Sequence, residues 1–394
     1  MTMRLPLLLR KAVLRYMGPV WALAVCAGWL VGCGSGGESG QPQDQPREMT
    51  AELDVSAARA GHADWFFDSS YIHDGAGLDG GIGHDCSDSA HVTHPSLVHA
   101  PGGWNSKKFW MAYSPVTSCR GAGDEDPRVI CSDDGLHWGV VVRDGDTIAN
   151  PIFRERDLDA RVHYLSDAEL FFDGQENLWL MFRAKFGIAE TDSVGLYVSC
   201  CDDGVTWNSP ALVVVDTGIG KGDCPLMSPA IIRCADDRYR MFVVDGSTGI
   251  RDTNVILIYA SSRPDSGWSL IDTIHPGVVS NSSSSIGQQV WHLDVIPRTG
   301  DELLGLFTMG DRVSLGANAT LYIGYSRDGG RNWKLSDGPV LQPRKGAWDS
   351  ELIYRATGYF PSGSANELKV YYSAYGGPGR TWHMGVTTVS FEAP

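Results

Sequence analysis

Short, strongly apolar segments recur in groups of three along the chain, beginning near residue 94. In each group the first segment opens on polar residues, the second is rich in aromatic residues, and the third leads into a turn. The first segments begin at His94, Asp167, Ser228, His292 and Asp349, so the groups repeat roughly every 60 to 70 residues. The apolar positions show no helical period, so we expect strands rather than helices.

A fourth apolar segment follows each of the first three groups. These segments read "GVVVRD", "ALVVVD" and "SLIDTI", and each is long enough for a further strand. The fifth group lacks such a segment, and "DWFFDSSYI" at 64–72 is the natural strand to close the ring from the N-terminal side. We therefore predict an all-β fold over residues 63–394, a five-bladed β-propeller with four-stranded antiparallel blades.

Three of the groups end in a turn with an Asp, a Gly and a Trp at a fixed spacing. The copies read "CSDDGLHW", "CCDDGVTW" and "SRDGGRNW", and they end at Trp138, Trp207 and Trp333. This motif resembles the Asp box of sialidases and related propellers, a hairpin between the third and fourth strands of a blade. The resemblance implies structural roles: Asp133, Asp202 and Asp328 cap the turns, the glycines adopt a positive φ, and the tryptophans are buried between blades.

Residues 1–32 are predicted to be a lipoprotein signal peptide. Basic residues precede an apolar run at 20–31 that is too short to span a membrane comfortably. The run ends in "LVGC", which resembles the lipobox of bacterial lipoproteins, so Cys33 is the expected lipid-bearing residue; an ordinary secretory signal is the alternative. Residues 33–62 form a predicted flexible tether whose first part is rich in Gly, Ser, Gln and Pro. Gly34 resembles the sorting pattern of outer-membrane lipoproteins, so we expect that location.

Net charge and cysteine content narrow the partners of the protein. A formal net charge of −15 argues against nucleic acid and against an anionic membrane surface, so the lipid is the expected membrane contact. The sequence contains no phosphate-binding loop and no dinucleotide fingerprint. Seven cysteines follow Cys33, and export favours disulfides, with Cys119–Cys131 and Cys224–Cys234 as candidate pairs.

The polar starts of the first segments predict a site at one mouth of the propeller channel. The innermost strand of each blade lines the channel, and its first and third residues face the same way. These positions hold His94 and Ser96, Asp167 and Glu169, Ser228 and Ala230, His292 and Asp294, and Asp349 and Glu351. We interpret the five carboxylates as candidate catalytic groups, because crowded carboxylates raise one another's pKa and suit acid–base chemistry. Polar strand starts that simply face solvent are the alternative interpretation.

A five-bladed propeller with carboxylates on its innermost strands resembles the arabinanase and β-xylosidase type of glycoside hydrolase, and the related invertases. Those families place catalytic carboxylates at the starts of the first, second and third blades. Here the first blade offers "HPS" and the third "SPA", so only the second blade, with Asp167 and Glu169, agrees. Either the catalytic set lies on the second, fourth and fifth blades, or the domain binds sugar without cleaving it.

Further residues complete the expected site. Asp85 and Asp88, in a glycine-rich loop, could replace the missing base of the first blade. The resemblance to arabinanases implies a calcium ion in the channel, with His292 as a ligand. His94 and His292 are also candidate substrate contacts, together with Tyr354 and Arg355 just beyond the carboxylates of the fifth blade.

We therefore expect a surface-anchored protein that acts on an oligo- or polysaccharide, and a glycoside hydrolase is the first hypothesis. One alternative is a non-catalytic carbohydrate-binding lipoprotein, and another is a scaffold propeller that binds a partner through a blade edge. A third is a sialidase-like exo-glycosidase. Sialidases clamp a carboxylate with three arginines, and Arg183, Arg312 and Arg355 are the residues that could approach the mouth.

Overall fold

The computed structural model describes residues 54–60, 64–67, 92–115, 125–143, 146–147, 150–187, 193–216, 225–246, 254–275, 288–311, 318–362, 364, 366–378 and 380–392. All of them belong to one compact unit, Ala51–Pro394. Within these ranges the regular structure is β-strand apart from one 3-10 turn, η2 (Glu155–Asp157). No helix of this part of the chain is long and apolar enough to cross a membrane. Six residues named as site, lipidation or disulfide candidates lie outside the described ranges, namely Cys33, Asp85, Asp88, Cys119, Cys224 and Arg312.

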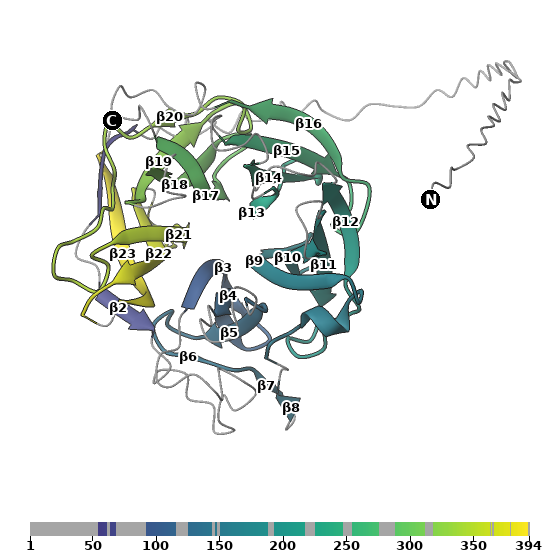
Figure 1. The fold of residues 1–394 in the computed structure, drawn as a ribbon. Coiled ribbons are helices and arrows are strands. Elements are labelled where there is room, and N and C mark those ends of the chain that lie inside the picture. The colour runs from purple at the N-terminus through teal and green to yellow at the C-terminus, as the bar shows by residue number, and fades with distance from the viewer. Residues whose placement is uncertain are drawn as a thin grey trace, which may run out of the picture. The chain divides into compact units, whose positions relative to one another are not determined.

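The strands form the predicted five-bladed propeller, in which β3, β9, β13, β17 and β21 are innermost (Figure 1). Blade 1 contains β3 (Val92–Trp104), β4 (Lys107–Pro115), β5 (Arg128–Ser132) and β6 (Trp138–Gly139). Blade 2 contains β9 (Val162–Phe172), β10 (Leu178–Phe186), β11 (Val194–Cys201) and β12 (Ala211–Asp216). Blade 3 contains β13 (Met227–Arg233), β14 (Tyr239–Asp245), β15 (Val255–Ser261) and β16 (Ser269–Ile274). Blade 4 contains β17 (Gln288–Pro297), β18 (Leu303–Asp311), β19 (Thr320–Ser326) and β20 (Lys334–Leu335), and blade 5 contains β21 (Leu352–Tyr359), β22 (Glu367–Gly376) and β23 (Thr381–Glu392).

Two N-terminal strands pair with the last strand of the chain. Both β1 (Asp54–Ala60) and β2 (Asp64–Phe67) lie antiparallel to β23, on the outer side of blade 5. β1 falls within the stretch predicted to be a tether, so the folded unit begins earlier than residue 63. The bias toward Gly, Ser, Gln and Pro ends before residue 54, and composition alone did not reveal a strand there. Between blades 1 and 2, β7 (Val142–Arg143) and β8 (Asp146–Thr147) form a small separate hairpin.

Buried side chains of the described residues form five hydrophobic clusters, and each cluster joins two neighbouring blades. The first and last blades are joined in the same way, because Tyr371 and Met384 of blade 5 pack with Phe109 and Ile130 of blade 1. Burial of apolar surface between blades therefore holds the ring together, and the channel is left for polar side chains.

The turns that follow β5, β11 and β19 have the predicted capping role, but two of them use a different aspartate. In the third copy Asp328 accepts the backbone hydrogen bonds of the turn, as expected. In the first two copies Asp134 and Asp203 accept these bonds, instead of Asp133 and Asp202. Counted from the last residue of the preceding strand to the tryptophan, the turns Ser132–Trp138 and Cys201–Trp207 are one residue shorter than Ser326–Trp333, so the second Asp of each pair takes the capping position two residues after the strand end.

The tryptophans of these turns pack between blades, as predicted. Trp138 and Trp333 are buried, and each donates from its indole nitrogen to a glycine carbonyl of its own turn. Trp207 is only partly buried, and it packs against the hydrophobic cluster between blades 1 and 2. Gly135 (φ 74°) and Gly330 (φ 89°) adopt the expected left-handed conformation.

The candidate disulfides are not formed. Cys131 and Cys234 are free thiols, which excludes their predicted pairing with Cys119 and Cys224. Cys131 is buried in the hydrophobic cluster between blades 1 and 2, where its sulfur packs against apolar side chains. Burial raises the pKa of this thiol to about 11, so it stays protonated and behaves as a small apolar group.

Candidate functional site

The innermost strand of every blade contains a bulge at the same level of the channel. The pairing register shifts between Thr93 and Ser96, Ser166 and Glu169, Met227 and Ala230, Val290 and His292, and Ile353 and Ala356. At each shift the innermost strand has one residue more than its partner. Bulges redirect side chains and are common beside active sites. The simple alternation that we assumed from the sequence is therefore interrupted at the site.

Three bulge residues have a left-handed backbone conformation. They are His94 (φ 51°), Asp167 (φ 53°) and Ser228 (φ 47°), and all three are buried. This conformation is unfavourable for a residue with a Cβ and costs on the order of 1–3 kcal/mol. Strain that is concentrated in a few polar residues at one level of a channel indicates a functional site rather than a packing requirement.

The side chains of His94, Asp167 and His292 converge from three blades. Oδ1 of Asp167 lies 3.4 Å from Nδ1 of His94 and 3.7 Å from Nδ1 of His292. One donor atom from each residue lies within 4.8 Å of the others. Ser228 completes the group: its backbone N–H donates to Oδ1 of Asp167 at 3.1 Å, and its hydroxyl contacts Nδ1 of His292. We call these four residues the polar cluster.

The electrostatics of the polar cluster favour an anion beside a neutral imidazole. Burial opposes ionisation of Asp167, but the neighbouring histidines His94 and His292, with the guanidinium groups of Arg183 and Arg355, outweigh it and hold the pKa of that carboxyl well below its usual value. Ser166 also donates to its second oxygen at 2.9 Å. Burial lowers the pKa of His292 well below its ordinary value, and His94 acts in the same direction. A carboxylate next to a neutral imidazole can bind a cation at neutral pH.

Three further side chains, those of Glu125, Tyr164 and Tyr354, lie around the polar cluster. Only Tyr354 had been predicted from the sequence as a site residue. Its ring lies edge-on to both histidines, with centroids 5.1 Å from His94 and 4.2 Å from His292. Glu125, which was not expected here, places Oε2 3.3 Å from Nε2 of His94. Burial raises the pKa of Tyr164 well above its ordinary value, and Glu125 adds to the effect, so this hydroxyl stays protonated. Glu125 lies outside the strands, where the repeat pattern gives no signal.

Arg355 crosses the channel and is completely buried. Its guanidinium donates to the carbonyl oxygens of Ala168 and Pro229, both at 3.1 Å, and to the carboxyl of Glu169 at 2.8 Å. The two carbonyls belong to residues that directly follow members of the polar cluster, so Arg355 holds two of the strained bulges in place. This corrects the expectation that Arg355 contacts substrate.

Arg183 is also occupied by the protein itself. It is buried, donates to the carbonyl oxygen of Pro225 at 2.9 Å and approaches the hydroxyl of Ser166 at 3.3 Å. With Arg355 engaged as well, the described residues offer no clamp of three free arginines. The arrangement therefore gives the sialidase-like hypothesis no support.

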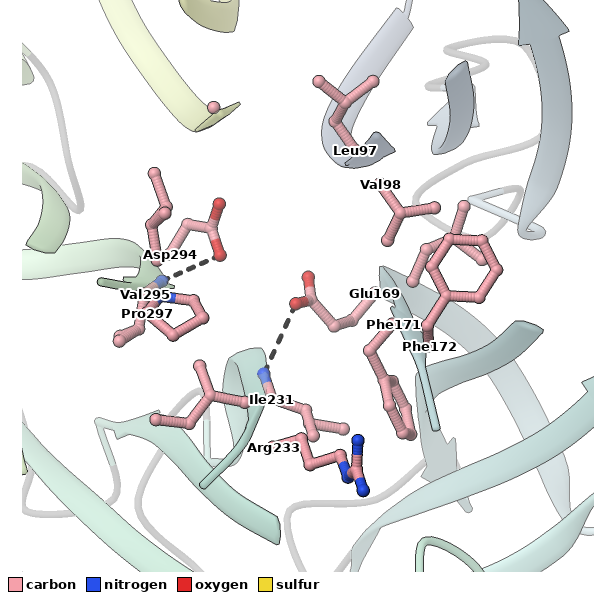
Figure 2. Close-up of a pocket in the computed structure, with 14 residues that line it drawn as sticks. Leu97, Val98, Glu169, Phe171, Phe172, Ile231, Arg233, Asp294, Val295 and Pro297 are labelled. Atoms are coloured by element: carbon pink, nitrogen blue, oxygen red, sulfur yellow. Dashed lines mark hydrogen bonds between the residues drawn. The ribbon is translucent and has the colours of Figure 1, made fainter. Parts of the chain in front are cut away.

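A cavity of about 240 Å³ lies toward the ends of the innermost strands (Figure 2). Its walls are mainly apolar and include Leu97, Val98, Phe171, Phe172 and Ile231. Glu169 and Asp294 face it from blades 2 and 4, and each accepts a backbone hydrogen bond there (Figure 2). These two predicted residues therefore share a cavity, and both are buried rather than exposed at an open mouth.

Glu169 carries a proton at neutral pH. Burial and the negative charge of Asp294 raise its pKa to about 8, although Arg355 opposes this rise. Burial raises the pKa of Asp294 as well. The cavity thus combines apolar walls with a protonated carboxyl group and a second carboxyl of raised pKa, which is the division of roles expected of an acid and its partner.

The fifth blade does not contribute Asp349 to the site. This residue is completely buried, accepts a bond from Nε of Arg344 at 2.9 Å and one from the hydroxyl of Tyr372 at 3.0 Å. Asp349 therefore belongs to a structural ion pair, and the prediction that it lines the mouth was wrong.

Glu351 likewise does not reach the polar cluster; it forms an ion pair with Arg380 at 2.8 Å. The innermost strand of blade 5 was predicted to start at Asp349, but β21 begins later in the chain, at Leu352. Tyr354 is therefore the residue that contacts the histidines. The letters "DSELI" have the same polar-to-apolar pattern as the true strand starts, and the pattern alone could not distinguish the two.

The fold and the polar cluster define the protein as a five-bladed β-propeller with a candidate metal-binding site in its channel. The chain is 27% identical over 336 residues to the A type blood N-acetyl-alpha-D-galactosamine deacetylase of Flavonifractor plautii, a match that covers 73% of this chain and 41% of the relative. The crystal structure of an N-acetylgalactosamine deacetylase from F. plautii, in complex with blood group B trisaccharide, has a TM-score of 0.61 at 23% identity. That match covers 77% of this chain and 92% of the other.

Two other solved structures share the fold. A protein of unknown function from Dyadobacter fermentans has a TM-score of 0.52 at 11% identity, covering 86% of this chain and all of the other. A glycoside hydrolase has a TM-score of 0.51 at 15% identity, covering 76% and 87%. The sequence matches no protein-family profile. Because the chain spans 41% of the length of its curated relative, the similarity concerns one part of that protein.

Proposed function

We propose that this protein is a glycan-active hydrolase that removes the acetyl group of an N-acetylated sugar at the polar cluster. The observation that carries the proposal is the convergence of His94, Asp167 and His292 on a strained level of the channel. The 27% identity to a deacetylase supports it. Of the five carboxylates expected of a glycosidase, only Asp167 lies in this cluster, where it stands between two histidines and not beside a second carboxylate of that set. This arrangement favours acyl transfer to water over glycosidic cleavage here.

The donor atoms of the polar cluster fit a transition metal ion. Within the described ranges, Nδ1 of His94 and Nε2 of His292 are buried without a hydrogen-bond partner, a costly state unless another group satisfies them. Two imidazole nitrogens and one carboxylate oxygen suit Zn²⁺ or a similar ion, whereas Ca²⁺ prefers roughly six to eight oxygen ligands. We therefore replace the expected calcium ion by a transition metal held by His94, Asp167 and His292.

The surrounding residues have roles that follow from their contacts. A metal ion bound there would polarise the acyl carbonyl and acidify a water molecule. The hydroxyl of Ser228 orients the His292 ring through Nδ1, and the carboxylate of Glu125, 3.3 Å from Nε2 of His94, is placed to do the same for that ring. Tyr164, which stays protonated, is the candidate donor to the acyl oxygen. Overall one water is consumed, the amide C–N bond breaks, and acetate and the free amino sugar leave.

Release of acetate from a glycan that carries N-acetylgalactosamine tests the proposal. We expect Asp167→Asn and His292→Gln each to lower the rate by at least about a hundredfold, together with a loss of bound metal measured by elemental analysis. Asp133→Asn is the control, because this exposed carboxylate pairs with Lys107 on the surface of blade 1. Full acetate release by Asp167→Asn would refute the assignment.

A second candidate function is glycoside hydrolysis in the cavity that Glu169 and Asp294 face. A protonated carboxyl and an ionised partner are the groups that glycosidases use, and the pKa of Glu169, about 8, suits an acid. New reducing ends that disappear in Glu169→Gln but persist in Asp167→Asn would establish this reaction in place of deacetylation. Glycan binding with neither product would leave the non-catalytic binding protein.

We also propose that the domain is held at the outer membrane through a lipid on Cys33, and that an oligo- or polysaccharide is its partner. The "LVGC" sequence and the composition of the segment that follows support the anchor. The proposed reaction at a glycan is consistent with an exported protein.

A further inference from the structure

A row of aromatic side chains on blade 5 leads away from the polar cluster. Tyr354 meets His292 with ring centroids 4.2 Å apart, and on its other side it meets Trp382 at 4.8 Å. Trp382 in turn meets Tyr375 at 5.1 Å. We call Tyr354, Tyr375 and Trp382 the aromatic shelf. The shelf forms a continuous path from the proposed reaction site to the surface of the hairpin β22–β23.

The outer end of the aromatic shelf is bordered by an exposed ion pair. The guanidinium of Arg380 lies 5.7 Å from the centre of the Tyr375 ring and pairs with Glu351 at 2.8 Å. The side chain of Arg380 is 66% exposed and that of Glu351 is 35% exposed. This border therefore offers both hydrogen-bond donors and acceptors to a ligand, without an excess of either charge.

The aromatic shelf is not part of the hydrophobic core. Tyr375 and Trp382 are half-buried, and neither belongs to the five clusters that join neighbouring blades. Large aromatic side chains that stay partly exposed beside a polar site are typical of ligand-binding surfaces. Tyr354 links the two environments, because it packs partly against the core between blades 3 and 4.

Hydrogen bonds and a close packing contact tie the hairpin that carries the shelf to the segment directly before β21. The backbone N–H of Glu351 donates to the carbonyl of Tyr375 at 3.0 Å, and the N–H of Gly377 donates to the hydroxyl of Ser350 at 3.1 Å. Gly376 approaches Ser350 so closely that a Cβ would lie 2.4 Å from its backbone nitrogen. The shelf is therefore preorganised, which lowers the entropic cost of binding.

We propose that the aromatic shelf binds the sugar ring that adjoins the residue deacetylated at the polar cluster. A hexopyranose has apolar faces of C–H groups that pack on aromatic rings, and hydroxyls at its edge that Arg380 and Glu351 can bind. The balanced charge of the border favours a neutral sugar over an anionic one. This inference rests on the proposed function for its geometry, and it makes the protein selective for oligosaccharides over monosaccharides.

Calorimetry with two probes tests the shelf without turnover. The probes are N-acetylgalactosamine and a trisaccharide that carries this sugar at its non-reducing end, and both are titrated into Asp167→Asn protein. Adding Trp382→Ala should weaken trisaccharide binding about tenfold and leave monosaccharide binding unchanged. Trp382→Phe should recover most of the loss. Trp268→Ala, at a half-buried tryptophan in the turn of blade 3, is the matched control and should change neither affinity.

The outcomes separate the aromatic shelf from the proposed reaction. The proposed role of the shelf would be refuted by any of three results. Trp382→Ala could weaken the binding of both probes equally, it could weaken neither, or the Asp167→Asn protein without it could fail to bind the trisaccharide. A selective loss of trisaccharide binding on Trp382→Ala, together with no acetate release by the protein that retains Asp167, would support the shelf and refute deacetylation. Acetate release, together with trisaccharide binding that Trp382→Ala does not change, would support deacetylation and refute the shelf.

Discussion

Replacing Glu169 by Gln should remove a large pH dependence from the stability of the protein. Glu169 is 3% exposed, accepts a hydrogen bond from Arg355 and faces the cavity that Asp294 shares. Burial and the charge of Asp294 raise its pKa from the ordinary value of 4.5 to about 8. Glutamine keeps the shape and the acceptor oxygen for Arg355 but cannot ionise, so the substitution isolates the cost of the charge.

The sign of the effect follows from the two pKa values of this carboxyl. Below pH 4.5 it is protonated in both the folded and the unfolded chain and contributes nothing. Between pH 4.5 and 8 the unfolded chain ionises and the folded chain does not, so the free energy of unfolding falls by about 1.4 kcal/mol per pH unit. Over these 3.5 pH units (8 minus 4.5) the free energy of unfolding falls by on the order of 5 kcal/mol, and above pH 8 this carboxyl causes no further decrease.

Urea denaturation between pH 5 and pH 9 measures this difference. We expect the free energy of unfolding of Glu169→Gln to exceed that of the parent by an amount that grows with pH and levels off above 8. Glu367→Gln, at an exposed position on β22, is the control and should follow the parent. Parallel curves for the parent and Glu169→Gln would refute the reasoning, because they would mean that Glu169 is ionised in the folded state and fully paired with Arg355.

Three further predictions concern the turns and the N-terminus. Trp138→Ala should cost about 3–5 kcal/mol of stability through the cavity it leaves, and Trp207→Ala roughly half as much, as measured by urea denaturation; equal costs would contradict the difference in burial. Asp134→Ala should cost about 1 kcal/mol because two backbone N–H groups lose their acceptor, whereas Asp133→Ala should stay within about 0.5 kcal/mol; the reverse order would restore the register predicted from sequence. Cys33→Ala should release the protein from the detergent-soluble membrane fraction, and unchanged partitioning would exclude the lipid anchor.

The propeller could be predicted because its signal is distributed over the whole chain. Each blade repeats the same order of apolar segments, so an error in one segment does not change the predicted number of blades. The position of a residue within a strand or turn is harder to predict, because it depends on single residues. Asp133 and Asp202 occupy the same place as Asp328 in an alignment of letters, yet a turn shorter by one residue passes the capping role to Asp134 and Asp203.

The site could be predicted in part, for a similar reason. His94, Asp167 and His292 were identified because each opens an apolar strand, and the structure brings them together. Glu125 was missed because it lies outside the repeated strands. The bulges were also invisible, since a polar residue followed by apolar residues reads the same with or without one extra residue. Asp349 was misplaced for that reason, and the true neighbour of the histidines is Tyr354.

The buried side chain of Arg355 contacts both the bulges that carry the polar cluster and Glu169, which faces the cavity. A bulge leaves backbone groups without ladder partners, and in blades 2 and 3 Arg355 supplies the donors that those carbonyls need. Its positive charge also lowers the pKa of Asp167 and opposes the rise in the pKa of Glu169. Arg355 therefore favours the ionised form of both carboxyl groups, and their difference has another origin. Against the effect of burial, the two histidines lower the pKa of Asp167, whereas burial and the charge of Asp294 raise that of Glu169. Arg355 thus links the strained bulges of blades 2 and 3 to the charge state of two carboxyl groups that stand two residues apart on β9.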